Sequence, residues 1–161
     1  MARDLFYWDA NAFLGFLNGE DDKSTYCEAV LEQARNGHVL IVTSALTLAE
    51  VLFIKGGKKL DPSKRGKVDI FFRADFISVK NVTRAISEMA RDVVWDFGVN
   101  PKDAIHVATA AFHRIPVLHT FDGPLIGKNG SVINGYALKI EKPNIPHQLP
   151  LLDKRGKPNE D

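Results

Sequence analysis

The chain has 161 residues, of which 45% are hydrophobic and 25% are charged, and its formal net charge is +1. This composition is that of an ordinary globular domain, and the charge gives no global indication of nucleic-acid binding. The single cysteine, Cys27, excludes an intramolecular disulfide and favours a reducing cytoplasm; we expect a small buried side chain there. The sequence lacks a membrane-length apolar run and a signal-peptide pattern, so we predict a cytoplasmic protein without a membrane segment.

Strand-type and helix-type segments alternate along the chain. In chain order, we predict a strand at 5–8, helices at 11–17 and 23–36, a strand at 39–42, helices at 45–54 and 68–73, a strand at 76–79, helices at 83–97 and 100–112, a strand from 116 to about 120, and an edge strand at 136–140. This alternation predicts an α/β domain with a mainly parallel sheet. We expect one domain over residues 1–145 and a polar C-terminal tail over residues 146–161.

Two aspartates follow predicted strands directly. Asp9 comes after the first strand, and Asp122 comes after the strand that begins at 116. In an open parallel sheet, ligands bind beyond the carboxyl ends of the strands. Each residue alone could equally be a loop acid that caps the next helix.

Two further acids lie in predicted helices. Asp103 is three residues after Asn100, so taken singly it is better explained as part of a capping box that complements the helix dipole. Glu50 interrupts the apolar stretch ALTLAEVLF, and a helix this apolar should be mostly buried. A buried carboxylate needs a cation or hydrogen bonds, and the nearest cationic residue in the sequence is Lys55.

If the four acids meet, their mutual repulsion requires a cation. Carboxylate oxygens suit Mg²⁺ or Mn²⁺, and such ions usually take up substrate phosphates. Phosphodiester hydrolysis is the chemistry that fits, because the metal would activate water and stabilise the leaving oxygen. The sequence contains no Gly-rich phosphate loop, no G-x-S-x-G motif and no Cys/His metal spacing.

Four segments together resemble the PIN domain family over roughly residues 4 to 125: YWDAN at 7–11, VTSALTLAEV at 42–51, DAIHVATA at 103–110 and LHTFD at 118–122. The resemblance implies a three-layer α/β/α sandwich and Mg²⁺- or Mn²⁺-dependent cleavage of single-stranded RNA. The four acids of the family fall on Asp9, Glu50, Asp103 and Asp122. Asn11 replaces the Ser or Thr that often follows the first acid by two, and Thr120 matches a hydroxyl position of the family.

The resemblance also extends to VapC-type toxins, which implies an antitoxin partner and a homodimer. Three alternatives remain: a freestanding PIN-like nuclease acting on other nucleic acid, a DNA flap-type nuclease, or a non-catalytic RNA- or protein-binding module. The four acids disfavour the last, and the short chain disfavours the flap-type nuclease.

Several other residues have two interpretations. His106 could contact substrate, although a buried, hydrogen-bonded structural role is favoured. A basic run includes Lys58, Lys59, Lys64 and Arg65, which could be solvated or could contact phosphates beside the acidic site. We expect Trp8 and Trp95 in the core and Asp96 in solvent.

Overall fold

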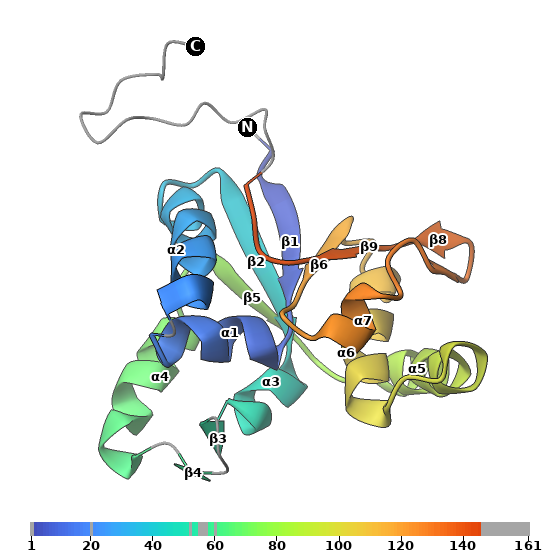
Figure 1. Ribbon diagram of the computed structural model, residues 1–161, viewed down its shortest axis with the longest axis horizontal. Coiled ribbons are helices and arrows are strands. Elements are labelled where there is room, and N and C mark those ends of the chain that lie inside the picture. The colour runs from blue at the N-terminus through green and yellow to red at the C-terminus, as the bar shows by residue number, and fades with distance from the viewer. Residues whose placement is uncertain (1, 20, 52, 55–57, 60, 146–161) are drawn as a thin grey trace.

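Five parallel strands form the centre of the molecule (Figure 1). The computed structural model describes residues 2–19, 21–51, 53–54, 58–59 and 61–145. The strands are β1 (Asp4–Trp8), β2 (Val39–Ser44), β5 (Ile77–Lys80), β6 (Val117–His119) and β9 (Lys139–Glu141), in the order β5-β2-β1-β6-β9. In the register, Phe6 lies between Ile41 and Val117. The predicted parallel sheet is therefore confirmed, with β1 at its centre.

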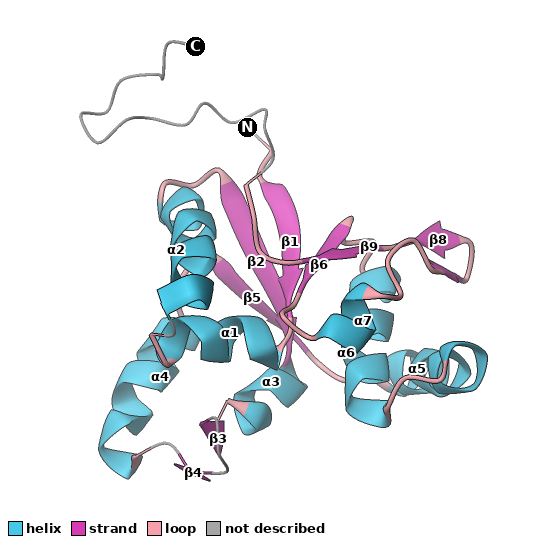
Figure 2. Cartoon of the chain, viewed as in Figure 1, coloured by secondary structure: helices cyan, strands magenta, loops and turns pink. Residues whose placement is uncertain are grey.

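Helices cover both faces of this sheet (Figure 2). One face carries α1 (Ala10–Leu17), α2 (Asp21–Arg35) and α4 (Arg65–Phe72), and the other carries α5 (Arg84–Phe97), α6 (Pro101–Phe112) and α7 (Gly123–Ile126). Successive strand side chains point to opposite faces, so Phe6 and Trp8 enter one hydrophobic core while Tyr7 enters the other. The predicted three-layer sandwich is confirmed.

Local sequence signals account for several helix ends. Thr83 caps α5 through the N–H of Ile86, and Gly98 adopts φ = 67° directly after that helix. Asn100 caps α6, which begins with Pro101. These ends agree with the sequence prediction. Cys27 is fully buried, as expected.

The predicted helix over residues 45–54 is wrong in its second half. Helix α3 (Ala45–Glu50) ends at Glu50, and β3 (Phe53–Ile54) pairs antiparallel with β4 (Lys58–Lys59). Aromatic and β-branched residues favour strands, and the sequence Gly56-Gly57 between them is typical of a hairpin. Only Thr47 of α3 is buried, so this is not the buried apolar helix that the sequence suggested.

Other expectations need smaller corrections. The edge strand predicted at 136–140 is two strands: β8 (Tyr136–Ala137) pairs with β7 (Val132–Ile133), whereas β9 joins the main sheet. Trp8 is fully buried, but Trp95 is 74% exposed, so its predicted core position is wrong. A 3₁₀ turn at Pro62–Lys64 precedes α4.

The predicted tail at 146–161 lies outside the described residues. Among the helices that the structure describes, none is long and apolar enough to cross a bilayer.

Candidate active site

Asp9 lies at the carboxyl end of the central strand and is only 2% exposed. Its Oδ1 accepts a hydrogen bond from the backbone N–H of Ala12 at 3.0 Å, which makes Asp9 the N-cap of α1. Its Oδ2 accepts from the hydroxyl of Thr120 at 2.5 Å. The capping interpretation of Asp9 is therefore correct in geometry, and the cap leaves a buried carboxylate at the edge where parallel sheets bind ligands.

Thr120 connects Asp9 with Asp122. Its buried hydroxyl donates to Asp9, and the same oxygen accepts from the backbone N–H of Asp122 at 3.1 Å. The carboxylate of Asp122 caps α7 by accepting from the N–H of Leu125 at 2.9 Å. Both aspartates thus cap a helix, and the Thr120 hydroxyl connects the carboxylate of Asp9 with the backbone of Asp122.

Asp103 lies in the first turn of α6 and is half-buried. Its N–H donates to Oδ1 of Asn100 at 3.0 Å, and the side-chain amide of Asn100 donates to its Oδ2 at 2.6 Å. Burial and then the charge of Asp122 raise the pKa of Asp103, with a further contribution from Glu50. Asp103 therefore belongs to a capping arrangement and also lies within the electrostatic field of two other acids.

Glu50 is the last residue of α3, and its side chain is 19% exposed. Its Oε1 lies 2.7 Å from Nε2 of His106, which is 1% exposed. The other ring nitrogen, Nδ1, lies 2.6 Å from the hydroxyl of Tyr7. The interpretation of His106 as a buried, hydrogen-bonded residue is confirmed, and its imidazole is the partner that the sequence around Glu50 lacked.

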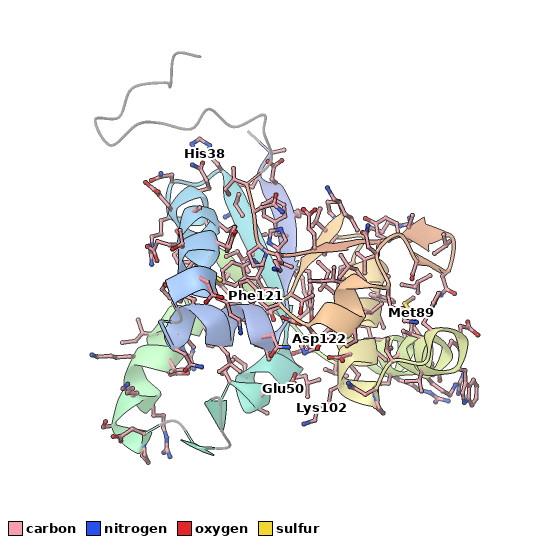
Figure 3. The ribbon with its side chains drawn as sticks, in the orientation of Figure 1. His38, Glu50, Met89, Lys102, Phe121 and Asp122 are labelled. Carbon is pink, nitrogen blue, oxygen red and sulfur yellow. The ribbon has the colours of Figure 1, made fainter. Side chains whose placement is uncertain are left out.

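Figure 3 shows Glu50 and Asp122 at the same end of the molecule, beyond the carboxyl ends of the strands. Burial raises the pKa of Asp9 to about 6, and the charge of Asp103 adds to this shift. His106, the Thr120 hydroxyl and the Ala12 N–H oppose the shift. The four acids therefore gather at one edge, where burial and repulsion between acids raise the pKa of Asp9 and of Asp103.

The structure tests whether these carboxylates would suit a cation. Among the described residues, no three Asp, Glu, His or Cys side chains converge closely enough to hold a metal ion by themselves. Mg²⁺, however, is usually bound through one or two carboxylates with several waters retained. Burial disfavours the ionised forms of Asp9 and Asp103, and a nearby cation would favour them, so these oxygen donors fit a hydrated divalent ion.

The structure describes the predicted supporting residue Asn11 and part of the predicted basic run. Asn11 lies exposed in the first turn of α1. Lys64 and Arg65 are exposed at the start of α4, whereas the side chains of Lys58 and Lys59 lie outside what the structure describes. Asp96 is exposed, as expected.

Two contributors to the site were absent from the sequence prediction. Tyr7 binds His106, and Thr43 donates to the carbonyl of Trp8 at 2.7 Å, which ties the end of β2 to the end of β1. Both are polar side chains within otherwise apolar strands, and this pattern could have identified them in the sequence.

An apolar pocket of about 320 Å³ lies elsewhere, between α5 and α6. Its lining includes Trp95, Pro101 and Ile105, and none of the four carboxylates.

The chain belongs to the PIN domain family, whose family model matches residues 6–125. No curated protein has a sequence that matches this chain.

Among solved structures, the fold is similar to Mycobacterium tuberculosis VapC20, described as a sarcin–ricin loop cleaving toxin, with 15% identity, a TM-score of 0.61, and coverage of 82% of this chain and 98% of that one. VapBC2 from Rickettsia felis, bound to a DNA fragment from its promoter, has 18% identity and a TM-score of 0.59, with coverage of 84% of this chain and 98% of that one. A toxin–antitoxin complex from Klebsiella pneumoniae has 19% identity and a TM-score of 0.53, with coverage of 88% of this chain and 99% of that one. At these identities the likeness concerns the fold.

Proposed function

We propose that this chain is a metal-dependent endoribonuclease whose acidic site consists of Asp9, Glu50, Asp103 and Asp122. The observation that carries the proposal is Asp9: a carboxylate only 2% exposed at the end of the central strand, with a pKa raised to about 6 and a second acid in its field. A buried carboxylate with a strongly raised pKa is typical of a functional site. Membership of the PIN domain family supports the same conclusion.

Asp9, Asp103, Asp122 and Glu50 would hold a Mg²⁺ or Mn²⁺ ion, directly or through water. When bound, the ion would supply activation of the attacking water and neutralisation of charge on the leaving 3′ oxygen. The protein itself supplies a fixed frame: Thr120 and the Ala12 N–H orient the two oxygens of Asp9. Tyr7 stays neutral, because burial raises its pKa well above the ordinary value.

The proposed substrate is single-stranded RNA. One similar structure is described as a toxin that cleaves the sarcin–ricin loop, which supports an RNA substrate. We further propose that Lys58, Lys59, Lys64 and Arg65 contact RNA phosphates. In Figure 1 the hairpin of β3 and β4 lies beyond α3, at the same end of the molecule as the carboxyl ends of the strands.

We also propose regulation by an antitoxin and a homodimeric state. Two of the similar structures are described as a toxin–antitoxin complex and as VapBC2, which supports an antitoxin. An arginine of such a partner could pair bidentately with the site carboxylates and exclude a cation. Co-purification of a small Arg-containing protein tests the first part, and light scattering of the purified chain tests the second.

Cleavage of an end-labelled single-stranded RNA tests the function. We expect the wild-type chain to cleave with Mg²⁺ or Mn²⁺, to stop with EDTA, and to leave 5′-phosphate ends. Asp103→Ala is expected to lose activity, with Asp96→Ala, which removes an exposed acid on α5, as the matched control. Preferential cleavage of branched DNA would favour the flap-type alternative, and full activity of Asp103→Ala would contradict the proposal.

A further inference from the structure

The imidazole of His106 connects Glu50 with the interior of the protein. Its two ring nitrogens lie 2.7 Å from Oε1 of Glu50 and 2.6 Å from the hydroxyl oxygen of Tyr7. The three residues come from α3, α6 and β1, and both Tyr7 and His106 are buried. A half-turn of the ring would replace both hydrogen bonds by carbon contacts, so the ring orientation is fixed.

The direction of these hydrogen bonds follows from the groups themselves. An ionised carboxylate only accepts, so Nε2 of His106 carries a proton and donates it to Glu50. The phenol of Tyr7 keeps its proton, because burial and then the charge of Asp9 raise its pKa. The Tyr7 hydroxyl can donate to Nδ1 or accept from it, so the contacts of both ring nitrogens are satisfied while Nε2 donates to Glu50.

Helix α3 has six residues, of which Thr47 is buried, while Leu48 is 43% exposed. Glu50 is the last residue of this helix, and the fully buried Val51 that follows it anchors the backbone. The carboxylate of Glu50 is 19% exposed, and a directional hydrogen bond from a buried ring on α6 sets its orientation.

We propose that His106 is a positioning residue that holds the carboxylate of Glu50 in its working orientation, with Tyr7 orienting the ring from behind. His106 donates to Oε1, so Oε2 would remain available as an acceptor or ligand. This inference rests on the proposed function, because it assigns the role of His106 through Glu50.

Two amide substitutions separate the two hydrogen bonds of His106. The amide nitrogen of Gln can take the place of Nε2, whereas that of Asn is nearer the place of Nδ1. In RNA cleavage, we expect His106→Gln to retain kcat within about threefold, and His106→Asn to lose roughly 10- to 100-fold in kcat with little change in KM. Tyr7→Phe removes only the hydroxyl, and we expect a smaller loss in kcat. Equal kcat for Asn, Gln and wild type would overturn the inference.

A double-mutant cycle with Glu50→Ala tests whether His106 acts through Glu50. Under single-turnover conditions, we expect His106→Asn to cause no further loss in the Glu50→Ala background. A further loss of the same factor in that background would show a role independent of Glu50 and contradict the inference. If Glu50→Ala is inactive while His106→Asn cleaves fully, the inference alone fails. If Glu50→Ala cleaves as wild type does, the proposed role of Glu50 fails, and the inference with it.

The ¹⁵N resonances of the His106 ring give a measurement that does not depend on cleavage. We expect the ring to carry a proton on Nε2 and its ¹⁵N resonances to shift in Glu50→Gln and Tyr7→Phe, with His106→Gln used for assignment. Unchanged resonances in both variants would contradict the hydrogen-bonded chain, even if His106→Asn failed to fold.

Discussion

Asp9 and Glu50 reach the same edge of the sheet by different means. Asp9 follows the central strand, and a backbone N–H and a buried hydroxyl hold its two oxygens. Glu50 ends a six-residue helix with one buried residue, and a histidine from α6 holds it. A main-chain and a side-chain hydrogen bond therefore fix Asp9 together, whereas a hydrogen bond between side chains fixes Glu50.

This difference has an energetic consequence. The ionised carboxylate of Asp9 destabilises the folded protein, because burial disfavours its charge more than the hydrogen bonds from Thr120 and Ala12 favour it. Glu50 remains partly exposed and receives a donor directly. We therefore expect removal of the charge at position 9 to stabilise the metal-free protein, and removal of the charge at position 50 to stabilise it little or not at all.

The largest expected effect on stability is that of Asp9→Asn. Folding raises the pKa of Asp9 from 3.8 to about 6, so ionisation destabilises the folded state, and stability falls as the pH rises through this window. Without metal at pH 7.5, we expect the free energy of unfolding of Asp9→Asn to exceed that of wild type by up to about 3 kcal/mol. The gain should disappear below about pH 4.

Urea denaturation at pH 4 and pH 7.5 measures this difference, with Glu50→Gln as the control. The amide introduced by Glu50→Gln retains an oxygen acceptor for Nε2 of His106, so we expect the stability of this variant to stay within about 0.5 kcal/mol of wild type. Equal stabilisation by both variants would break the distinction between the two carboxylates.

The next largest effect is expected from Thr120→Val, which keeps the shape of the side chain and removes the hydroxyl shared by Asp9 and Asp122. We expect a loss of roughly 10- to 100-fold in RNA cleavage, because an orienting partner of the site is removed. Ser131→Ala removes a hydroxyl that donates to the carbonyl of Lys128, and should leave cleavage unchanged. Wild-type kcat for Thr120→Val would show that Asp9 needs no side-chain support.

The smallest effect is expected at the start of α4. Combined replacement of Lys64 and Arg65 by Ala should weaken RNA binding severalfold and reduce the slope of log K against log salt by about 1.4. Replacement of Arg84, an exposed residue at the start of α5, serves as the matched control. An unchanged salt slope would show that this basic segment does not contact the RNA.

Features of the site that depend on neighbouring residues were predictable from the sequence, whereas contacts between distant residues were not. The positions of Asp9 and Asp122 were predictable, because a strand end is visible in local apolar patterning. The pairing of Glu50 with His106 was not, because it joins residues 56 positions apart. The apolar stretch after Glu50 suggested a longer buried helix, but its aromatic and β-branched residues form a strand instead.

Asp103 shows that two interpretations of one residue can both hold. The sequence favoured a helix-capping role, and the structure confirms hydrogen bonds with Asn100. The same carboxylate also lies in the field of Asp122 and Glu50, which no local pattern encodes. Trp95 illustrates the opposite failure, since a large apolar residue on an amphipathic helix lies 74% exposed.

The most direct test of the acidic site is single-turnover cleavage of single-stranded RNA by wild type and Asp9→Asn across a Mg²⁺ titration. Asn can keep both contacts, accepting from the Ala12 N–H and donating to Thr120, so the change removes charge while leaving the frame in place. We expect wild-type cleavage to rise with Mg²⁺ and the variant to be slower by on the order of 1000-fold at every concentration. Cleavage by Asp9→Asn at the wild-type rate, or wild-type cleavage undiminished in EDTA, would contradict the proposed site.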